Sequence, residues 1–253
     1  MSDITRQNQI MEILNEEKSV SVSKLIKRLY VSPATIRRDL EDMAKKGLLK
    51  RVHGGAILFA SKNEESSIIT RSKTMVQEKR AIAASTINFL KNNQSIFLDS
   101  SSTVCALVPY LNDFKYLTLI TNSLTTAIEI GEKTDFKVFV PSGFVKRPSN
   151  SLLGDATNQI LSDLHCDLFI FSAAGMDTRR GITEASIEQA ETKKIMMRNA
   201  ETRILLLDHS KFGQSFLAKS CDLADVDILV TDQKPNEEFM KYLSRYSNLQ
   251  IVY

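Results

Sequence analysis

Seven short apolar runs, separated by amphipathic segments, fill the chain beyond residue 90. This alternation restricts the fold more than any other feature of the sequence. The runs are SIFLD, LTLIT, FKVFVPSG, DLFIFSA, RILLLD, DILVTD and LQIVY. Short runs without polar interruption are typical of strands buried on both faces, and helical segments between such strands are typical of parallel sheets. The sequence therefore predicts an α/β fold built on a mostly parallel sheet.

Polar residues cluster in the turns that follow the predicted strands. In open, Rossmann-like sheets, ligands bind outside the carboxyl ends of the strands. These turns offer hydroxyls, amides, carboxylates and an ammonium group, which together suit a polyhydroxylated anion such as a sugar phosphate. The candidate ligand-binding residues are Asp99, Ser100, Ser101, Ser102, Thr103, Thr121, Asn122, Gly143, Gly175, Asp177, Asp208 and Lys211.

The first of these turns, DSSSTVCALVPYL, carries four consecutive hydroxyl residues, Ser100 to Thr103, into a predicted helix. A helix N-terminus presents unpaired N–H groups and a partial positive charge. We therefore expect these hydroxyls to hold the phosphate. The carboxylates and the amide of the other turns are expected to contact sugar hydroxyls or to position Lys211.

Positive charge is concentrated near the start of the chain. Residues 1–58 hold 11 Lys and Arg against 7 Asp and Glu, whereas the rest of the chain holds 22 against 23. This distribution favours a nucleic-acid-binding head on a nearly neutral body. We expect the head over residues 1–58, a linker over the polar segment 59–75, and a sensing and oligomerisation domain over residues 76–253.

The stretch VSPATIRRDL, residues 31–40, has the features of a DNA-recognition helix. Ser32 is a favourable N-cap, Pro33 suits the first helical position, and Gly47 is a natural stop. The buried face of this helix is predicted to hold Ile36, Leu40 and Met43. With two preceding helices and a following hairpin, the pattern predicts a winged helix-turn-helix whose helix 34–46 enters the major groove. The pattern alone leaves open a three-helix docking domain with a solvated arginine face.

The candidate DNA-binding residues lie at the start of this helix and in the hairpin, or wing, that follows it. Side chains of the helix are expected to contact phosphates and base edges. The basic side chains of the wing are expected to approach the backbone or the minor groove, with its paired glycines permitting a tight turn. A solvated wing is the alternative. The candidates are Ser32, Ala34, Thr35, Arg37, Arg38, Lys50, Arg51, His53, Gly54 and Gly55.

Motifs along the whole chain resemble those of the DeoR family of bacterial transcription regulators. In the head these are the VS-x-x-TIRRDL core and the G-x-L-x-R-x-HGGA tail; in the body they are DSSST, TNS, GMD-x-x-x-GIT and DHSKFG. The resemblance implies a repressor of a sugar-utilisation operon whose affinity for operator DNA is controlled by a phosphorylated sugar. It also implies that Lys211 supplies the countercharge to the phosphate. Where the commoner family motif has glycine, this chain has Ser101.

Two other functions are compatible with the sequence. An active sugar-phosphate isomerase or deaminase with a DNA-binding head needs a general base, for which Asp99, Asp177, Glu184 and Asp208 are candidates. The deaminase-type loop is matched only in part by GMDTRRGITEA, which lacks the histidine. The other possibility is a DNA-binding protein whose body serves only for oligomerisation.

Several classes of protein are disfavoured by composition. No apolar run approaches the roughly 20 residues that span a bilayer, and the polar start MSDITRQNQ lacks the apolar core of a signal peptide. We therefore expect a cytoplasmic protein without a membrane partner. The three cysteines and three histidines lack metal-ligand spacing, so we expect no metal and no cofactor. Because helix-turn-helix modules pair on two half-sites, we expect a homodimer or homotetramer.

Overall fold

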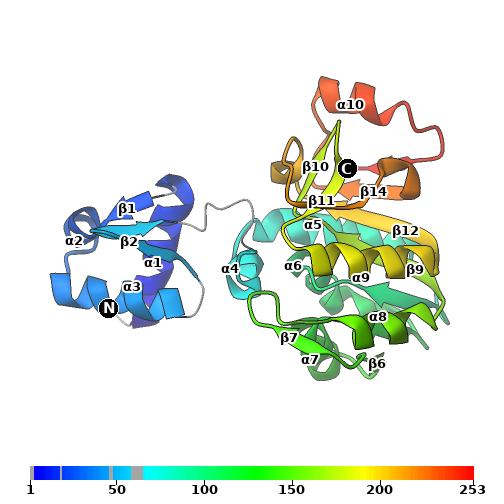
Figure 1. Cartoon of the computed structure of the whole chain (residues 1–253), viewed down its shortest axis with the longest axis horizontal. Coiled ribbons are helices and arrows are strands. Elements are labelled where there is room, and N and C mark those ends of the chain that lie inside the picture. Colours follow the sequence, from blue (N-terminus) through cyan, green and yellow to red (C-terminus); the bar gives the residue numbers. More distant parts are fainter. Residues whose placement is uncertain (1–2, 18, 46–47, 58–64) are drawn as a thin grey trace.

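The computed structural model describes residues 3–17, 19–45, 48–57 and 65–253, and Figure 1 shows a small head and a larger body. The head consists of α1 (Asp3–Glu17), β1 (Ser19–Ser21), α2 (Val22–Leu29), α3 (Pro33–Lys45), β2 (Lys50–Val52) and β3 (Gly55–Ile57). Its strands form an antiparallel sheet in the order β1-β3-β2. The predicted winged helix-turn-helix is confirmed, and β1 is a strand that the sequence analysis did not predict.

Apolar side chains from the three helices form the core of the head. Ile36, Leu40 and Met43 of α3 are fully buried, as their spacing predicts. The helix also begins as predicted, because the Ser32 hydroxyl oxygen accepts the Thr35 backbone N–H at 3.2 Å and Pro33 is the first helical residue. The stop predicted at Gly47 lies outside the described residues.

The body is built on a seven-stranded parallel sheet in the order β15-β14-β12-β9-β4-β5-β6. The strands are β4 (Ser95–Leu98), β5 (Thr118–Thr121), β6 (Lys137–Phe139), β9 (Cys166–Ser172), β12 (Ala200–Leu207), β14 (Ile228–Thr231) and β15 (Gln250–Val252). Each predicted apolar run supplies one of them, so the predicted Rossmann-like sheet is confirmed. The FKVFVPSG run forms a strand only as far as Phe139.

Alternate residues of the central strands pack on opposite faces of this sheet. Phe97, Phe169 and Phe171 point to one face, where the rings of Phe169 and Phe171 stack with centroids 4.6 Å apart. Ile96 and Leu98 point to the other face. The helices of the body are α4 (Ile68–Lys73), α5 (Val76–Thr86), α6 (Ser102–Cys105), α7 (Leu124–Lys133), α8 (Asp155–Ser162), α9 (Ile187–Arg198) and α10 (Glu237–Leu243).

Short antiparallel strands, which the sequence analysis did not predict, surround one end of the sheet. They are β7 (Phe144–Lys146) with β8 (Ser151–Leu153), and β10 (Gly175–Asp177) with β11 (Gly181–Glu184) and β13 (Ala218–Cys221). The order of the main sheet reverses between β4 and β9, since β5 and β6 extend one way and β12, β14 and β15 the other. Such a reversal leaves a crevice at the carboxyl ends of the two strands.

Residues 65–75 differ from the linker predicted over 59–75. They form α4 and its flanks, which pack on the body: the Ser67 hydroxyl caps the helix, Ile68 is buried, and the Ile68 N–H donates to the Pro148 carbonyl at 2.6 Å. A six-residue helix is too short to show a clear period in the sequence. Residues 59–64 of the predicted linker lie outside the described residues. Within the described part of the chain, no helix has the length and apolar character needed to cross a bilayer.

Candidate functional site

The first turns of α3 present basic side chains to solvent. Ala34, Arg37 and Arg38 are exposed, and Thr35 is half-buried with its hydroxyl 2.9 Å from that of Ser32. Among the described residues, neither arginine has an ion-pair partner. These guanidinium groups are therefore available for phosphates or base edges, as the sequence predicts for a recognition helix.

The basic residues of the wing are accessible to solvent. Lys50, Arg51 and His53 are exposed. Gly54 has a φ of +77°, and a Cβ on Gly55 would lie 2.2 Å from the Val20 carbonyl oxygen. Both glycines are thus required by the hairpin itself, which gives a structural reason for the paired glycines of the HGGA motif.

A buried ion pair, missed by the sequence analysis, fixes α3 against α1. Asp39 follows the two exposed arginines and accepts from Arg6 through both carboxylate oxygens, with Nη2 to Oδ1 at 2.9 Å. Both side chains are more than nine-tenths buried. Because a bidentate guanidinium–carboxylate pair has a fixed geometry, it orients the helix that carries Arg37 and Arg38.

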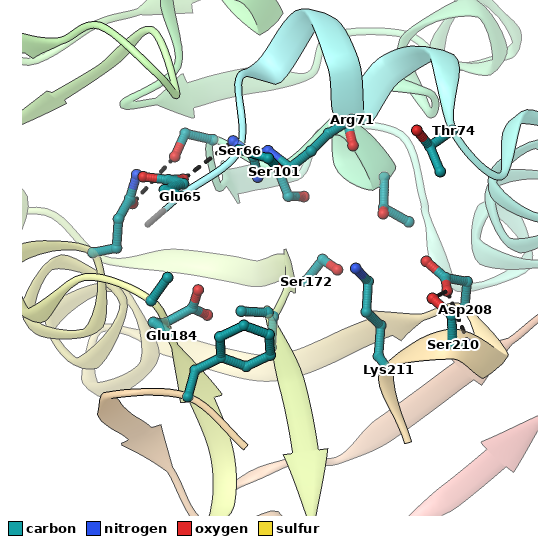
Figure 2. Close-up of a pocket in the computed structure, with 18 of the residues that line it drawn as sticks. Glu65, Ser66, Arg71, Thr74, Ser101, Ser172, Glu184, Asp208, Ser210 and Lys211 are labelled. Carbon is teal, nitrogen blue, oxygen red and sulfur yellow. Dashed lines mark hydrogen bonds and ion pairs between the residues drawn. The ribbon is translucent and has the colours of Figure 1, made fainter. Parts of the chain in front are cut away.

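The body contains a cavity of about 280 Å³ at the carboxyl ends of β4, β9 and β12 (Figure 2). Hydroxyl groups, cations and carboxylates all line it. The hydroxyl residues include Ser100, Ser101, Ser102, Thr103, Ser172 and Ser210; the cations are Arg71, Lys79, Lys193 and Lys211; the carboxylates are Glu65, Glu184 and Asp208. This mixture of groups is suited to a small polar anion that carries hydroxyls.

The hydroxyl-rich turn after β4 is held in place from below by Asp99. This carboxylate is 1% exposed and accepts the backbone N–H groups of Ser101 at 2.8 Å and Ser172 at 3.0 Å. It therefore shapes the turn and does not face the cavity. The Ser101 hydroxyl caps α6 by accepting from Val104 at 3.1 Å. Since α6 is a single turn, Ser102–Cys105, its N-terminus has less of the partial positive charge that a longer helix would provide.

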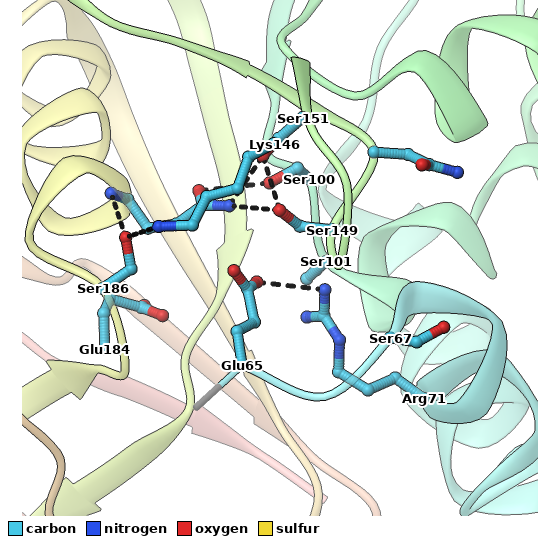
Figure 3. A network of polar contacts seen from close by, with 12 residues as sticks. Glu65, Ser67, Arg71, Ser100, Ser101, Lys146, Ser149, Ser151, Glu184 and Ser186 are labelled. Atoms are coloured by element: carbon cyan, nitrogen blue, oxygen red, sulfur yellow. Dashed lines mark hydrogen bonds and ion pairs between the residues drawn. The ribbon is translucent and has the colours of Figure 1, made fainter. Parts of the chain in front are cut away.

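A polar network connects this turn to α9 and to the loop before β8 (Figure 3). The Ser100 hydroxyl donates to Gln189 Oε1 at 3.2 Å, and Gln189 Nε2 donates to the hydroxyls of Ser149 and Ser151 at 3.2 and 2.9 Å. All four side chains are buried. The network fixes one wall of the cavity before any ligand binds.

A buried lysine binds two carboxylates at the base of the cavity. Lys193 Nζ lies 2.6 Å from Glu184, 3.0 Å from Asp99 and 2.5 Å from the Ser172 carbonyl oxygen. Burial opposes its charge, but the two carboxylates outweigh burial and raise the pKa of Lys193. Burial raises the pKa of Glu184, against the opposing effect of Lys193. Lys193 is thus occupied by protein groups.

Two further lysines, Lys211 and Lys79, also line the cavity. Figure 2 shows Lys211 pointing into the cavity beside Asp208, and among the described residues its ammonium group has neither a hydrogen-bond nor an ion-pair partner. Asp208 instead accepts from Ser210. Lys79 donates to the carbonyl oxygens of Arg71 and Thr74, and burial lowers its pKa to about 8.

The cavity includes only some of the predicted ligand-binding residues. Ser100, Ser101, Ser102, Thr103, Asp208 and Lys211 line it. Asp99 lies beneath the cavity, and the others outside the lining have structural roles elsewhere. Thr121 accepts the Ser123 N–H, Asn122 donates to the Leu152 carbonyl, and Asp177 accepts the N–H groups of Arg179 and Arg180. Gly143 has a φ of +154° and lies close to Thr157, and Gly175 packs against Gln214.

Most of the charged groups around the cavity were not predicted from the sequence. Arg71 and Glu65 lie in the predicted linker, and Lys79 and Lys193 lie on helices where a lysine would ordinarily face solvent. Glu184 was considered only as a possible general base. Among the described residues, no group of three or more His, Cys, Asp or Glu side chains is arranged to hold a metal ion.

Two known domain families match the chain. Residues 6–62 match the DeoR-like helix-turn-helix domain, and residues 74–233 match the DeoR C terminal sensor domain. The chain belongs to the DeoR family of transcriptional regulators. The resemblance identified from the sequence motifs is thereby confirmed.

Relatives of this DeoR regulator align with it along nearly its whole length. It is similar to the HTH-type transcriptional regulator GolR of Listeria innocua, with 35% identity over 95% of both chains. It is also similar to the glycerol-3-phosphate regulon repressor of Escherichia coli, with 30% identity over 96% of both, and to the lactose phosphotransferase system repressor of Staphylococcus epidermidis, with 32% identity over 94% of this chain and 95% of the relative. The protein is a DNA-binding transcriptional regulator.

Proposed function

We propose that this DeoR regulator represses a sugar-utilisation operon and that a phosphorylated sugar in the body cavity lowers its affinity for operator DNA. The observation that carries the proposal is the cavity itself, which is lined both by a turn of four hydroxyl residues and by Lys211, whose ammonium group has no ion-pair partner in the described part of the chain. A phosphate carries nearly two negative charges and accepts several hydrogen bonds. Hydroxyls and cations in a partly enclosed site match both properties.

The names of the relatives support this ligand class. One is a glycerol-3-phosphate regulon repressor and another a lactose phosphotransferase system repressor. One name refers to a phosphorylated metabolite and the other to a phosphotransferase system for a sugar. By analogy, Ser100, Ser101, Ser102 and Thr103 hold the phosphate and Lys211 neutralises it.

On the DNA side, we propose that α3 enters the major groove with Thr35, Arg37 and Arg38 closest to the bases, while Lys50, Arg51 and His53 of the wing approach the backbone. Two heads are needed to bind two half-sites, so the protein acts as a cytoplasmic homodimer or homotetramer assembled through the body. The head ends near residue 58, and the body begins at Glu65, upstream of the boundary predicted from the sequence.

A thermal-shift screen of sugar phosphates, followed by operator binding, tests the proposal. The expected result is one compound that raises the melting temperature without being consumed and that releases operator DNA. Lys211→Ala should bind operator normally but should no longer respond to that compound, since a charge-assisted contact contributes about 1.5–3 kcal/mol. Lys234→Ala removes an exposed lysine outside the cavity and serves as the control.

The screen also separates the alternatives. Turnover of the stabilising compound would indicate an enzyme, and the absence of any stabilising compound would indicate a body that serves only for assembly. If Lys211→Ala releases DNA at the same ligand concentration as the wild type and the Lys234→Ala control, Lys211 does not bind the ligand and the site is misplaced.

A further inference from the structure

The segment that follows the head forms one wall of the cavity. Glu65, Ser66, Thr70, Arg71 and Thr74 all line it. These residues come from α4 and its flanks, which also pack against α6. The proposed ligand would therefore contact residues that lie only a few positions beyond the DNA-binding head in the chain.

This wall has polar atoms that lack partners. Among the described residues, five buried side-chain nitrogen or oxygen atoms have no hydrogen-bond partner, and three of these belong to this one segment. They are Glu65 Oε2, Thr70 Oγ1 and Arg71 Nε. Leaving a buried polar group unpaired costs free energy, so a concentration of such groups on the wall of a cavity favours a ligand-binding role for that wall.

Glu65 and Arg71 form one hydrogen bond with each other, whereas a bidentate pair would form two. Arg71 Nη2 lies 3.1 Å from Glu65 Oε1, and Figure 3 shows the two side chains meeting at the cavity next to Ser101. A bidentate pair would also satisfy Arg71 Nε and Glu65 Oε2. In the observed pair both of these atoms lack a partner, so Arg71 can donate a hydrogen bond to a second anionic group in the cavity.

Glu65 is poorly placed as a permanent partner. It lies near the buried Glu184, whose pKa is raised first by burial and also by the charges of Asp99 and Glu65. With Glu65 in place, four cations face three carboxylates in the cavity lining. Displacement of Glu65 removes one of these carboxylates, which makes the cavity more favourable for a phosphate, an anion of roughly −1.5 to −2 charge at neutral pH.

We propose that Arg71 is a ligand-binding residue and that the anionic group of the ligand displaces Glu65 from it. The oxygens of the ligand accept from the Arg71 guanidinium group and the Thr70 hydroxyl, and the Glu65 carboxylate leaves the cavity. This inference rests on the proposed anion-binding function. It adds the way in which ligand binding in the cavity affects the segment that leads to the DNA-binding head. A ligand shifts a conformational equilibrium only through such a difference in contacts between the two states.

The remaining contacts of α4 explain why displacement of Glu65 affects the chain toward the head and not the whole helix. The Ile68 N–H is bonded to Pro148, and Lys79 binds the carbonyl oxygens of Arg71 and Thr74 at the other end. These bonds hold α4 on the body. Glu65 precedes these bonds in the chain, so its release loosens only the residues that lead from the head into α4.

Phosphate binding to the full-length protein tests the exchange, with inorganic phosphate as the probe in a phosphate-free buffer and calorimetry as the readout. Glu65→Gln removes the competing charge and should bind phosphate roughly tenfold more tightly. Arg71→Gln should bind it roughly tenfold to a hundredfold more weakly. Lys73→Gln removes an exposed charge from the same helix and should leave the Kd within about twofold, because screening weakens exposed charges.

Opposite effects on the Kd distinguish competition from a merely structural ion pair, since loss of a structural pair would weaken binding in both variants or change neither. Hydrogen exchange gives a second readout: phosphate should speed exchange of the peptide that contains Glu65 in the wild type, and Glu65→Gln should exchange rapidly without phosphate. Slow exchange in both states would overturn the inference.

Anion binding in the cavity and the exchange of Glu65 are tested independently. If Lys211→Ala loses phosphate binding while Glu65→Gln and Arg71→Gln keep the wild-type Kd, the cavity binds anions and the exchange is wrong. If the wild type does not bind phosphate, the exchange is overturned; if it also fails to bind any compound in the sugar-phosphate screen, the proposed function is overturned with it.

Discussion

The charged cluster at the base of the cavity yields a sharp prediction for Lys193→Met. The substitution keeps most of the side-chain volume and removes the charge. Asp99 keeps its two backbone N–H donors, but the carboxylate of Glu184 loses its ion-pair partner while it remains buried. Removing one member of a buried ion pair costs about 3–5 kcal/mol, because the remaining charge has no compensation. For a domain of this size, that corresponds to a fall in melting temperature of roughly 10 °C.

The loss should depend on pH in a defined direction. The pKa of Glu184 is raised above its ordinary value of 4.5 already in the wild type, and loss of Lys193 raises it further. A carboxyl group whose folded pKa exceeds its unfolded pKa stabilises the fold below the unfolded value, and that stability is lost as the pH rises through the folded value. The Lys193→Met protein should therefore recover stability as the pH falls from neutral toward 4.5, the ordinary pKa of glutamate.

Differential scanning calorimetry of the full-length protein across this pH range is the appropriate assay. Lys194→Met, at the adjacent and exposed position of α9, controls for the loss of one lysine and the gain of one methionine. Equal melting temperatures for the Lys193 and Lys194 variants would refute the predicted contribution of the buried ion pairs to stability. An equal deficit at every pH would refute the assignment of the uncompensated charge to Glu184.

The head offers three further tests. Arg37→Ala combined with Arg38→Ala should weaken operator binding by roughly 1–3 kcal/mol for each arginine that contacts a base, and unchanged fluorescence anisotropy titrations would exclude α3 as the recognition helix. Lys50→Ala combined with Arg51→Ala should reduce the magnitude of the slope of log K for operator binding against log salt concentration by about two. An unchanged slope would indicate that these wing residues do not contact DNA phosphates. Leu40→Ala, at a fully buried position, should destabilise the head by about 2–5 kcal/mol, and head amides that exchange no faster than in the wild type would contradict the described core.

Sequence patterns predicted the head well because its signals are local. The cap at Ser32, the proline at the first helical position and the spacing of Ile36, Leu40 and Met43 all act within one helix, and the structure has each of them. The seven strands were predictable for a similar reason, since apolar runs buried on both faces contrast with their polar turns. The partner of Asp39 was not predictable, because Arg6 is 33 positions away.

The cavity was predictable only in part, because its charged residues are brought together by the tertiary fold. The turn after β4 and Lys211 follow strands, so the rule for parallel sheets identifies them. The same rule also selects Asn122 and Asp177, since it cannot tell which turns meet above the crevice. Arg71 could not be found, because α4 is too short to show a period.

The packing of α4 on the body determines where a chimeric regulator can be joined. A fusion that replaced everything before residue 76, the boundary suggested by the sequence, would discard Glu65, Thr70 and Arg71 together with the old head. Under the proposed mechanism, such a hybrid would recognise its new DNA site yet would no longer respond to the metabolite. A junction upstream of Glu65 would keep the two properties in one protein, and gene fusions that exchanged heads in nature would have faced the same restriction.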